Sequence, residues 1–124
     1  MSSDCQMQNN KTTVVYACAG CADVGGIADQ IGRKLRHDGF ATPKASCLAG
    51  IGAGIQSFID AAKGADRVIT IDGCDVECAK KTLENIGIQS QPVILTRMGL
   101  EKGNASPTPE LVNDLCQTIV SQFK

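Results

Sequence analysis

The chain has 124 residues, 43% of them hydrophobic, with 12 basic and 13 acidic side chains and a formal net charge of −1. This length suits one domain with a core of its own, and the balanced charge offers no field to attract nucleic acid or an anionic membrane. The 7 cysteines exceed the share of an ordinary intracellular domain and need an explanation.

A tail, a strand and a helix are expected first. Residues 1–11 lack the basic region and apolar run of a secretion signal and predict a flexible tail. A run rich in β-branched residues predicts a strand over 12–17. Ile27, Ile31 and Leu35 recur at a spacing of four and predict an amphipathic helix over 26–38.

The next segment predicts a weaker strand and a second helix. Residues 40–46 suit a strand, and Pro43, which has no backbone N–H, indicates an edge position. The glycine-rich stretch 47–54 then leads into a helix whose apolar face carries Ile55 to Ala62 at helical spacing. Gly64 is expected to end that helix.

A third strand over 67–72 is the clearest buried strand of the chain. Gly73 and Cys74 follow it directly, and Asp75 is the expected N-cap of a third helix. That helix is expected to end at Gly87.

A fourth strand is expected over 92–96, followed by a loop over 97–106. Thr108 and Pro109 predict the start of a last helix, since proline is favoured in a first helical turn. Its apolar face would carry Val112, Leu115, Cys116, Ile119 and Phe123.

Strand and helix thus alternate four times, in the order βαβαβαβα. This order predicts an α/β fold: a three-layer sandwich with a mostly parallel sheet of about four strands. No interior linker divides the chain, so one domain is expected over 12–124. No stretch approaches membrane-spanning length.

Five cysteines fall in the predicted loops between strands and helices. In a parallel sheet these loops emerge at the carboxyl ends of the strands, so residues distant in sequence gather at one edge. Cys74 and Cys78, four residues apart across a helix start, are expected to face the same way. The five loop cysteines are Cys18, Cys21, Cys47, Cys74 and Cys78.

The expected carboxyl edge suits thiolates. Helix N-termini carry partial positive charge and unpaired N–H groups, which lower cysteine pKa values and offset negative charge. Four cysteines satisfy either tetrahedral zinc or an iron–sulfur cluster. In a reducing compartment, clustered cysteines are more often metal ligands or redox thiols than disulfides. We therefore expect a cytoplasmic protein that binds a metal ion.

Three blocks of the sequence resemble the DGC-domain family, named for its Asp-Gly-Cys motif. They are Tyr16-Ala-Cys18-Ala-Gly-Cys21, then Ser46-Cys47-Leu-Ala-Gly, then Asp72-Gly73-Cys74 with Cys78. The resemblance runs from about Val14 to Gly99 and implies a small zinc-binding protein with four chelating cysteines. By position these are Cys18, Cys47, Cys74 and Cys78, with zinc favoured over an iron–sulfur cluster.

Cys21 adds a fifth candidate, so the sequence leaves open which four of the five bind metal. Cys21 equally suits the role of a resolving thiol or a bystander. The alternative function is thiol–disulfide redox or sulfur-transfer chemistry by the same cysteines, in which Cys18 with Cys21, or Cys74 with Cys78, would cycle between dithiol and disulfide.

The remaining candidates have structural interpretations. Cys116 is expected to pack as a small hydrophobe and Cys5 to lie in the tail. Asp72 is expected to bond a backbone amide of the next turn; the alternatives are to orient a metal ligand through a hydrogen bond or to act as a base. His37 suits a solvated helix end. The glycines at 50, 52 and 54 lack the Lys-Ser/Thr of a phosphate-binding loop.

Overall fold

Three parallel strands form the sheet in the computed structural model, which describes residues 12–20, 22–44 and 46–123. Their order across the sheet follows the chain, with β2 paired on both sides. The strands are β1 (Thr13–Ala17), β2 (Arg67–Asp72) and β3 (Gln91–Ile94). The expected α/β class and parallel sheet are therefore confirmed, with three strands in the described residues where about four were expected.

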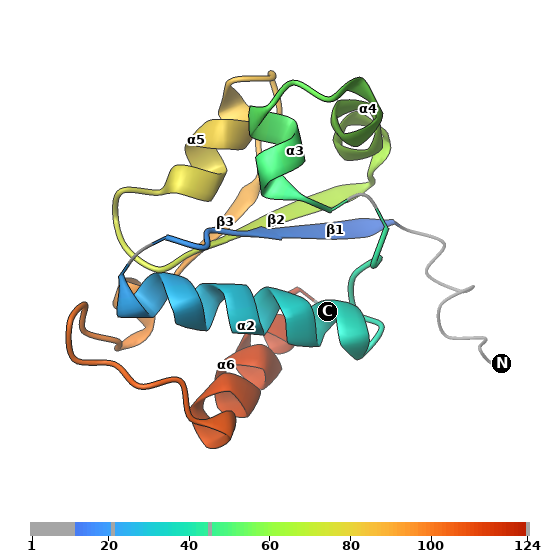
Figure 1. The fold of residues 1–124 in the computed structure, drawn as a ribbon. Coiled ribbons are helices and arrows are strands. Elements are labelled where there is room, and N and C mark those ends of the chain that lie inside the picture. The colour runs from blue at the N-terminus through green and yellow to red at the C-terminus, as the bar shows by residue number, and fades with distance from the viewer. Residues whose placement is uncertain (1–11, 21, 45, 124) are drawn as a thin grey trace, which may run out of the picture.

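Helices cover both faces of the sheet, as Figure 1 shows. One face carries α2 (Asp23–His37) and α6 (Pro109–Gln122). The other carries α3 (Leu48–Gly52), α4 (Gln56–Gly64) and α5 (Cys78–Glu84), and a short 3₁₀ helix, η1 (Leu95–Met98), follows β3. Within the described ranges no helix is long and apolar enough to cross a membrane.

Alternation along the strands divides the core into two layers, because successive strand residues point to opposite faces. One set of buried strand residues packs with α2 and α6, and the other packs under α3, α4 and α5. The first layer includes Val15, Ile69, Ile71, Ile27, Ile31, Leu115 and Ile119; the second includes Val14, Tyr16, Val68, Ile51, Ala62 and Leu83.

The strand expected over 40–46 is not formed in its described residues. This segment makes one backbone hydrogen bond to β1, from Thr42 N to Thr13 O at 2.9 Å. Pro43 follows and has no N–H with which to continue a ladder. The segment therefore runs beside β1 without becoming a fourth strand.

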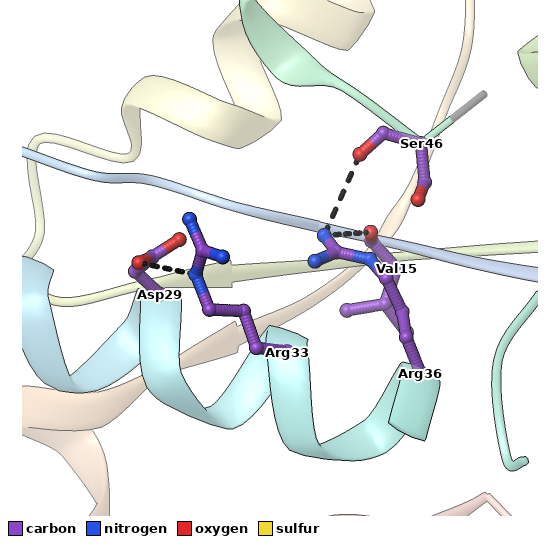
Figure 2. Close-up of polar contacts among 5 residues, drawn as sticks. All are labelled: Val15, Asp29, Arg33, Arg36 and Ser46. Atoms are coloured by element: carbon purple, nitrogen blue, oxygen red, sulfur yellow. Dashed lines mark hydrogen bonds and ion pairs between the residues drawn. The ribbon is translucent and has the colours of Figure 1, made fainter. Parts of the chain in front are cut away.

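A side chain occupies the next pairing position on β1. The Arg36 guanidinium, from the last turn of α2, donates to Val15 O at 3.0 Å and to Ser46 O at 3.5 Å (Figure 2). Figure 2 also shows Arg33 of the same helix paired with Asp29, so Arg33 binds within the helix whereas Arg36 reaches the strand. Arg36 thus satisfies one backbone carbonyl of the edge strand, a group that would otherwise be open to pairing with another chain.

Other boundaries follow or correct the sequence expectations. The strand over 67–72 is confirmed, and Thr108 Oγ1 accepts from Leu111 N at 3.2 Å as the N-cap of α6. The segment 47–54, expected as a loop, contains α3. The last strand ends at Ile94, because the chain turns into η1 there.

Two glycines allow backbones to touch at the start of α2. A Cβ on Gly25 would lie 2.9 Å from both the N and the O of Gly20, and a Cβ on Gly73 would lie 2.6 Å from the carbonyl carbon of Val24. These obstacles are backbone atoms, which cannot swing aside as a side chain could. Gly25 and Gly73 are therefore required by close packing of α2, β2 and the loop after β1.

Adjacent glycines of α2 should respond oppositely to substitution. Gly25→Ala should destabilise the fold by about 2 kcal/mol through overpacking. Gly26 is exposed, and a Cβ there meets nothing within 4 Å, so Gly26→Ala should stabilise by roughly 0.5–1 kcal/mol through helix propensity. Urea unfolding of the two variants measures both changes, and equal effects would contradict the packing described here.

Candidate functional site

Three of the predicted cysteines follow strand ends or begin a helix at the carboxyl edge of the sheet, the left edge in Figure 1. Cys18 directly follows β1 and its N–H donates to Ile71 O of β2 at 3.0 Å. Cys74 lies two residues beyond β2, and Cys78 is the first residue of α5. Cys18 is buried, Cys74 is partly exposed and Cys78 is exposed.

Cys18 is held by backbone amides. The N–H of Gly73 donates to its Sγ at 3.2 Å, which joins the ends of β1 and β2. Burial raises the pKa of the Cys18 thiol, the amides of Gly73 and Gly20 oppose that rise, and the charges of Asp72 and Cys78 add to it. The net effect is a pKa of the Cys18 thiol above its ordinary value.

Asp72 anchors the helix that carries Cys78. Its side chain is 1% exposed and accepts from Ala79 N at 2.7 Å and from Lys80 N at 3.2 Å. Burial raises the pKa of this carboxyl, while the two amides lower it. The expected bond from Asp72 to an amide of the next turn is therefore present, and it reaches across a five-residue loop.

The expectation that Asp75 caps this helix is wrong. Asp75 forms an exposed ion pair with Arg97 at 3.2 Å, and Glu77 occupies the cap position with a left-handed φ of 59°. Because α5 begins only at Cys78, Cys74 lies in the loop before the helix, and the two cysteines do not share a helix face. Cys74 Sγ instead lies 3.7 Å from Lys102 Nζ.

Cys47 does not follow a strand, which corrects the reason for expecting it at the carboxyl edge. It immediately precedes α3 and is exposed. Its charge acts on Tyr16 and Arg36, whereas the cysteine whose charge acts on Cys18 is Cys78. The charge of Cys78 thus raises the pKa of the Cys18 thiol, and the charge of Cys47 raises the pKa of Tyr16.

Tyr16 lies in the core layer under α3 and α5, with 0% of its surface exposed. Its hydroxyl has no hydrogen-bond partner in the described part of the chain. Burial raises its pKa to about 12, the Arg36 charge lowers it and the Cys47 charge raises it. Tyr16 is thus a buried donor without a partner in the described residues, and its pKa responds to the charge of a candidate ligand, Cys47.

The other candidate residues lie away from this edge or outside the described residues. Cys116 is 3% exposed and its Sγ lies 3.9 Å from Ile31 O, so its expected packing role is confirmed. Cys5 and Cys21 lie outside the described residues. His37 is exposed as the last residue of α2, at the amino edge of the sheet and away from Cys18.

Two functional candidates carried no sequence signal. Asp23, the first residue of α2, accepts from Gly103 N and from Ala105 N, each at 2.9 Å. These amides lower the pKa of Asp23 and tie the loop before α6 to α2. Because that loop carries Lys102, Asp23 places an ammonium group beside Cys74 across about 80 residues of sequence.

The donor set is of the right chemical kind for zinc, since thiolates are preferred ligands of this borderline-soft ion. The Gly73 amide on Cys18 also supplies the positive dipole that a thiolate site needs. In the described residues, however, no group of three or more His, Cys, Asp or Glu side chains lies close enough to hold a metal ion. The cysteines are adjacent at one edge but do not converge on one point.

Comparisons with known proteins agree on one family. The family description that matches the chain is the DGC domain, over residues 14–121. A relative from Pseudomonas aeruginosa, the anaerobic and virulence modulator AnvM, is 30% identical over 90 residues, which cover 72% of this chain and 67% of the relative. No solved structure matches the chain.

The two aspartates of the loop after β2 should differ in their effect on stability. Asp72→Ala leaves two amides of α5 without their acceptor and should cost about 2 kcal/mol. Asp75→Ala removes only an exposed ion pair and should change stability by less than about 0.5 kcal/mol. Urea unfolding tests this order, and a larger loss for Asp75→Ala would refute the capping role of Asp72.

Tyr16 provides a pH test, because it is the single tyrosine of a chain without tryptophan. The ordinary pKa of 10.0 describes the unfolded state, and burial raises the folded value to about 12. The folded state therefore keeps its proton longer, so stability is intact below about pH 10 and is lost as the pH rises through about 12. Phenolate absorbance should show ionisation coupled to unfolding; titration near pH 10 in the folded protein would contradict the burial.

Proposed function

The chain belongs to the DGC domain family, and on that premise we propose that it is a zinc-binding protein. The ion would be held at the carboxyl edge by Cys18, Cys74 and Cys78, with Cys47 or Cys21 as the fourth ligand. Its place of action would be the cytoplasm, where reduced thiols remain available as ligands.

The single observation that carries this proposal is the contact between Cys18 Sγ and the N–H of Gly73 at 3.2 Å. It joins the first cysteine block to the Asp-Gly-Cys motif and aims a donor at sulfur. Zinc with four thiolates leaves a net charge of −2, which backbone amides and the nearby Lys102 would offset. A bound zinc ion would have to offset the burial that raises the pKa of the Cys18 thiol, and the Gly73 amide would assist it.

The residues around the cysteines would place the ligands. Asp72 fixes the first turn of α5 and with it Cys78, through bonds to Ala79 N and Lys80 N. Cys74 lies in the loop between these fixed points, where Glu77 turns the chain with a positive φ. A bound zinc ion would link the loop after β1 to the loop after β2.

The role served by the ion is proposed to be regulatory. The relative from Pseudomonas aeruginosa is described as a modulator, and the closed, amide-lined surroundings of Cys18 suit a site that stabilises one conformation. Metal binding to thiolates releases protons and couples directly to folding, which is one physical route to such control.

Elemental mass spectrometry tests the zinc site on protein purified without added metal or tag-derived nickel. About one zinc per chain is expected, from a single tetrahedral site. Cys18→Ser should abolish binding, whereas Cys116→Ser, at a buried cysteine on α6, serves as the matched control and should keep it. Comparison of Cys47→Ser with Cys21→Ser then identifies the fourth ligand.

Absence of zinc that persists after anaerobic reconstitution would refute this function. The same samples also test the redox alternative, because the described cysteines are free thiols that could be oxidised. They are Cys18, Cys47, Cys74, Cys78 and Cys116. Loss of thiols in pairs on mild oxidation, with no metal released, would favour thiol–disulfide chemistry. Protection of those thiols by zinc would favour the metal site.

A further inference from the structure

We propose that the C-terminal end of α6, residues 116–123, is a gate over the buried thiol of Cys116, and that Arg67 holds this gate closed. The gate lies on the face of the sheet that carries α2 and α6, so it is independent of the zinc site proposed at the carboxyl edge. Three observations support it: a cation at the end of α6, a cavity beside that end, and a buried thiol that the zinc site does not use.

Arg67 joins the end of α6 to the sheet. Its Nη1 donates to the backbone O of Phe123, and its Nε donates to Thr13 Oγ1 of β1 at 3.1 Å. The guanidinium also lies over two aromatic rings, 5.3 Å from the centroid of Phe40 and 5.8 Å from that of Phe123. One side chain therefore combines a charge-assisted hydrogen bond with cation–π contacts at the end of the helix.

The last turn of α6 depends on this contact because the helix has no cation of its own there. Within Pro109–Gln122 the first turn carries Glu110 and is capped by Thr108, whereas the last turn has no basic residue. Carbonyl groups at a helix C-terminus lack partners within the helix and carry partial negative charge. Arg67 supplies the positive charge from β2, so the two ends of α6 are held by different contacts.

The end of α6 packs incompletely against the end of α2. A cavity of about 570 Å³ lies between them, and its lining includes Leu35, Phe40, Cys116 and Val120. Side chains that line a cavity lose packing contacts on one side. Beyond Cys116 the gate has one fully buried side chain, that of Ile119. Opening of this end therefore gives up few buried contacts, which is a property of segments that unfold locally.

Cys116 lies where the gate begins. It is 3% exposed, and its Sγ lies 3.9 Å from Ile31 O of α2. Burial raises the pKa of this thiol to about 11, the Lys34 charge lowers it and the Asp38 charge raises it. The closed gate thus keeps the thiol covered and protonated, whereas opening leaves it free to ionise and react. The open state is therefore the route by which a small electrophile or oxidant reaches Cys116.

The rate at which N-ethylmaleimide, a small neutral thiol reagent, labels Cys116 in the full chain measures opening of the gate. Peptide mass spectrometry reports that rate, and the rate in urea-unfolded protein gives its value without protection. Low concentrations of urea distinguish local from global opening, because the urea dependence of the rate scales with the surface that opening exposes. We expect slow labelling that is nearly independent of urea, with a slope well below the m value of global unfolding.

Variants at the two ends of α6 locate the segment that moves. Arg67→Met should speed labelling of Cys116 about tenfold, the effect of losing one hydrogen bond from a charged group. Phe123→Leu removes one aromatic ring and keeps the backbone acceptor, so it should speed labelling less. Arg97→Met, at an exposed arginine with one ion pair, is the matched control and should leave the rate unchanged. Thr108→Ala weakens the cap at the other end of α6 and should also leave it unchanged.

A urea slope equal to the m value would show that Cys116 is reached by global unfolding and would overturn the proposal. Unchanged labelling in both Arg67→Met and Phe123→Leu would also overturn it. Equal acceleration by Thr108→Ala and Arg67→Met would do the same, because the whole helix would then detach. If Arg67→Met fails to fold, Phe123→Leu carries the test with Arg67 in place. Cys116 is not among the proposed zinc ligands, so failure of the gate and failure of the zinc site are distinguishable.

Discussion

The hydrogen bond from Gly73 N to Cys18 Sγ is the contact on which the carboxyl edge depends. It exists because β2 ends against the first turn of α2 with no side chain between them, and a Cβ on Gly73 would overlap the backbone of Val24 and Gly25. The glycine of the Asp-Gly-Cys motif is therefore a packing requirement. The positions of Asp72 and Cys74, on either side of Gly73, depend on this packing.

Two carboxylates at this edge accept hydrogen bonds from backbone amides and hold neighbouring segments in place. Asp72 binds the first amides of α5 and thereby fixes Cys78, and Asp23 binds amides of the loop that carries Lys102. Each bond crosses between segments far apart in sequence or separated by a loop. Cys78 thus follows backbone held by Asp72, while Cys74 lies in the irregular loop between β2 and α5.

Local patterns predicted the elements with strong local signals. The β-branched run of β2 and the Thr108-Pro109 start of α6 were both predictable, because propensity and packing agree there. The fourth strand was not, because Pro43 ends the ladder and Arg36 takes the carbonyl of Val15 from outside the segment. The side chain of Arg36, which lies outside the segment, takes part in this outcome, and the local sequence pattern of residues 40–46 carries no sign of that contact.

The site was predictable where the cysteine followed a strand that formed. Cys18 and Cys74 follow their strands as expected, whereas Cys78 does not share a helix face with Cys74 and the position of Cys47 was argued from the strand that is absent. Asp75 has the residue type and position of a helix cap, yet the amides of α5 bind the carboxylate of Asp72. Asp72 is buried, and burial strengthens its hydrogen bonds. Asp23 acts across 80 residues and Lys102 across 28, so both could be found only in three dimensions.

Anomalous diffraction from crystals, recorded on both sides of the zinc absorption edge, tests the account most directly because it identifies the ion and its ligands together. The account predicts one peak at the carboxyl edge, in bonding contact with the sulfur atoms of Cys18, Cys74 and Cys78, at about 2.3 Å from each. A peak elsewhere, or none after reconstitution with zinc, would contradict it.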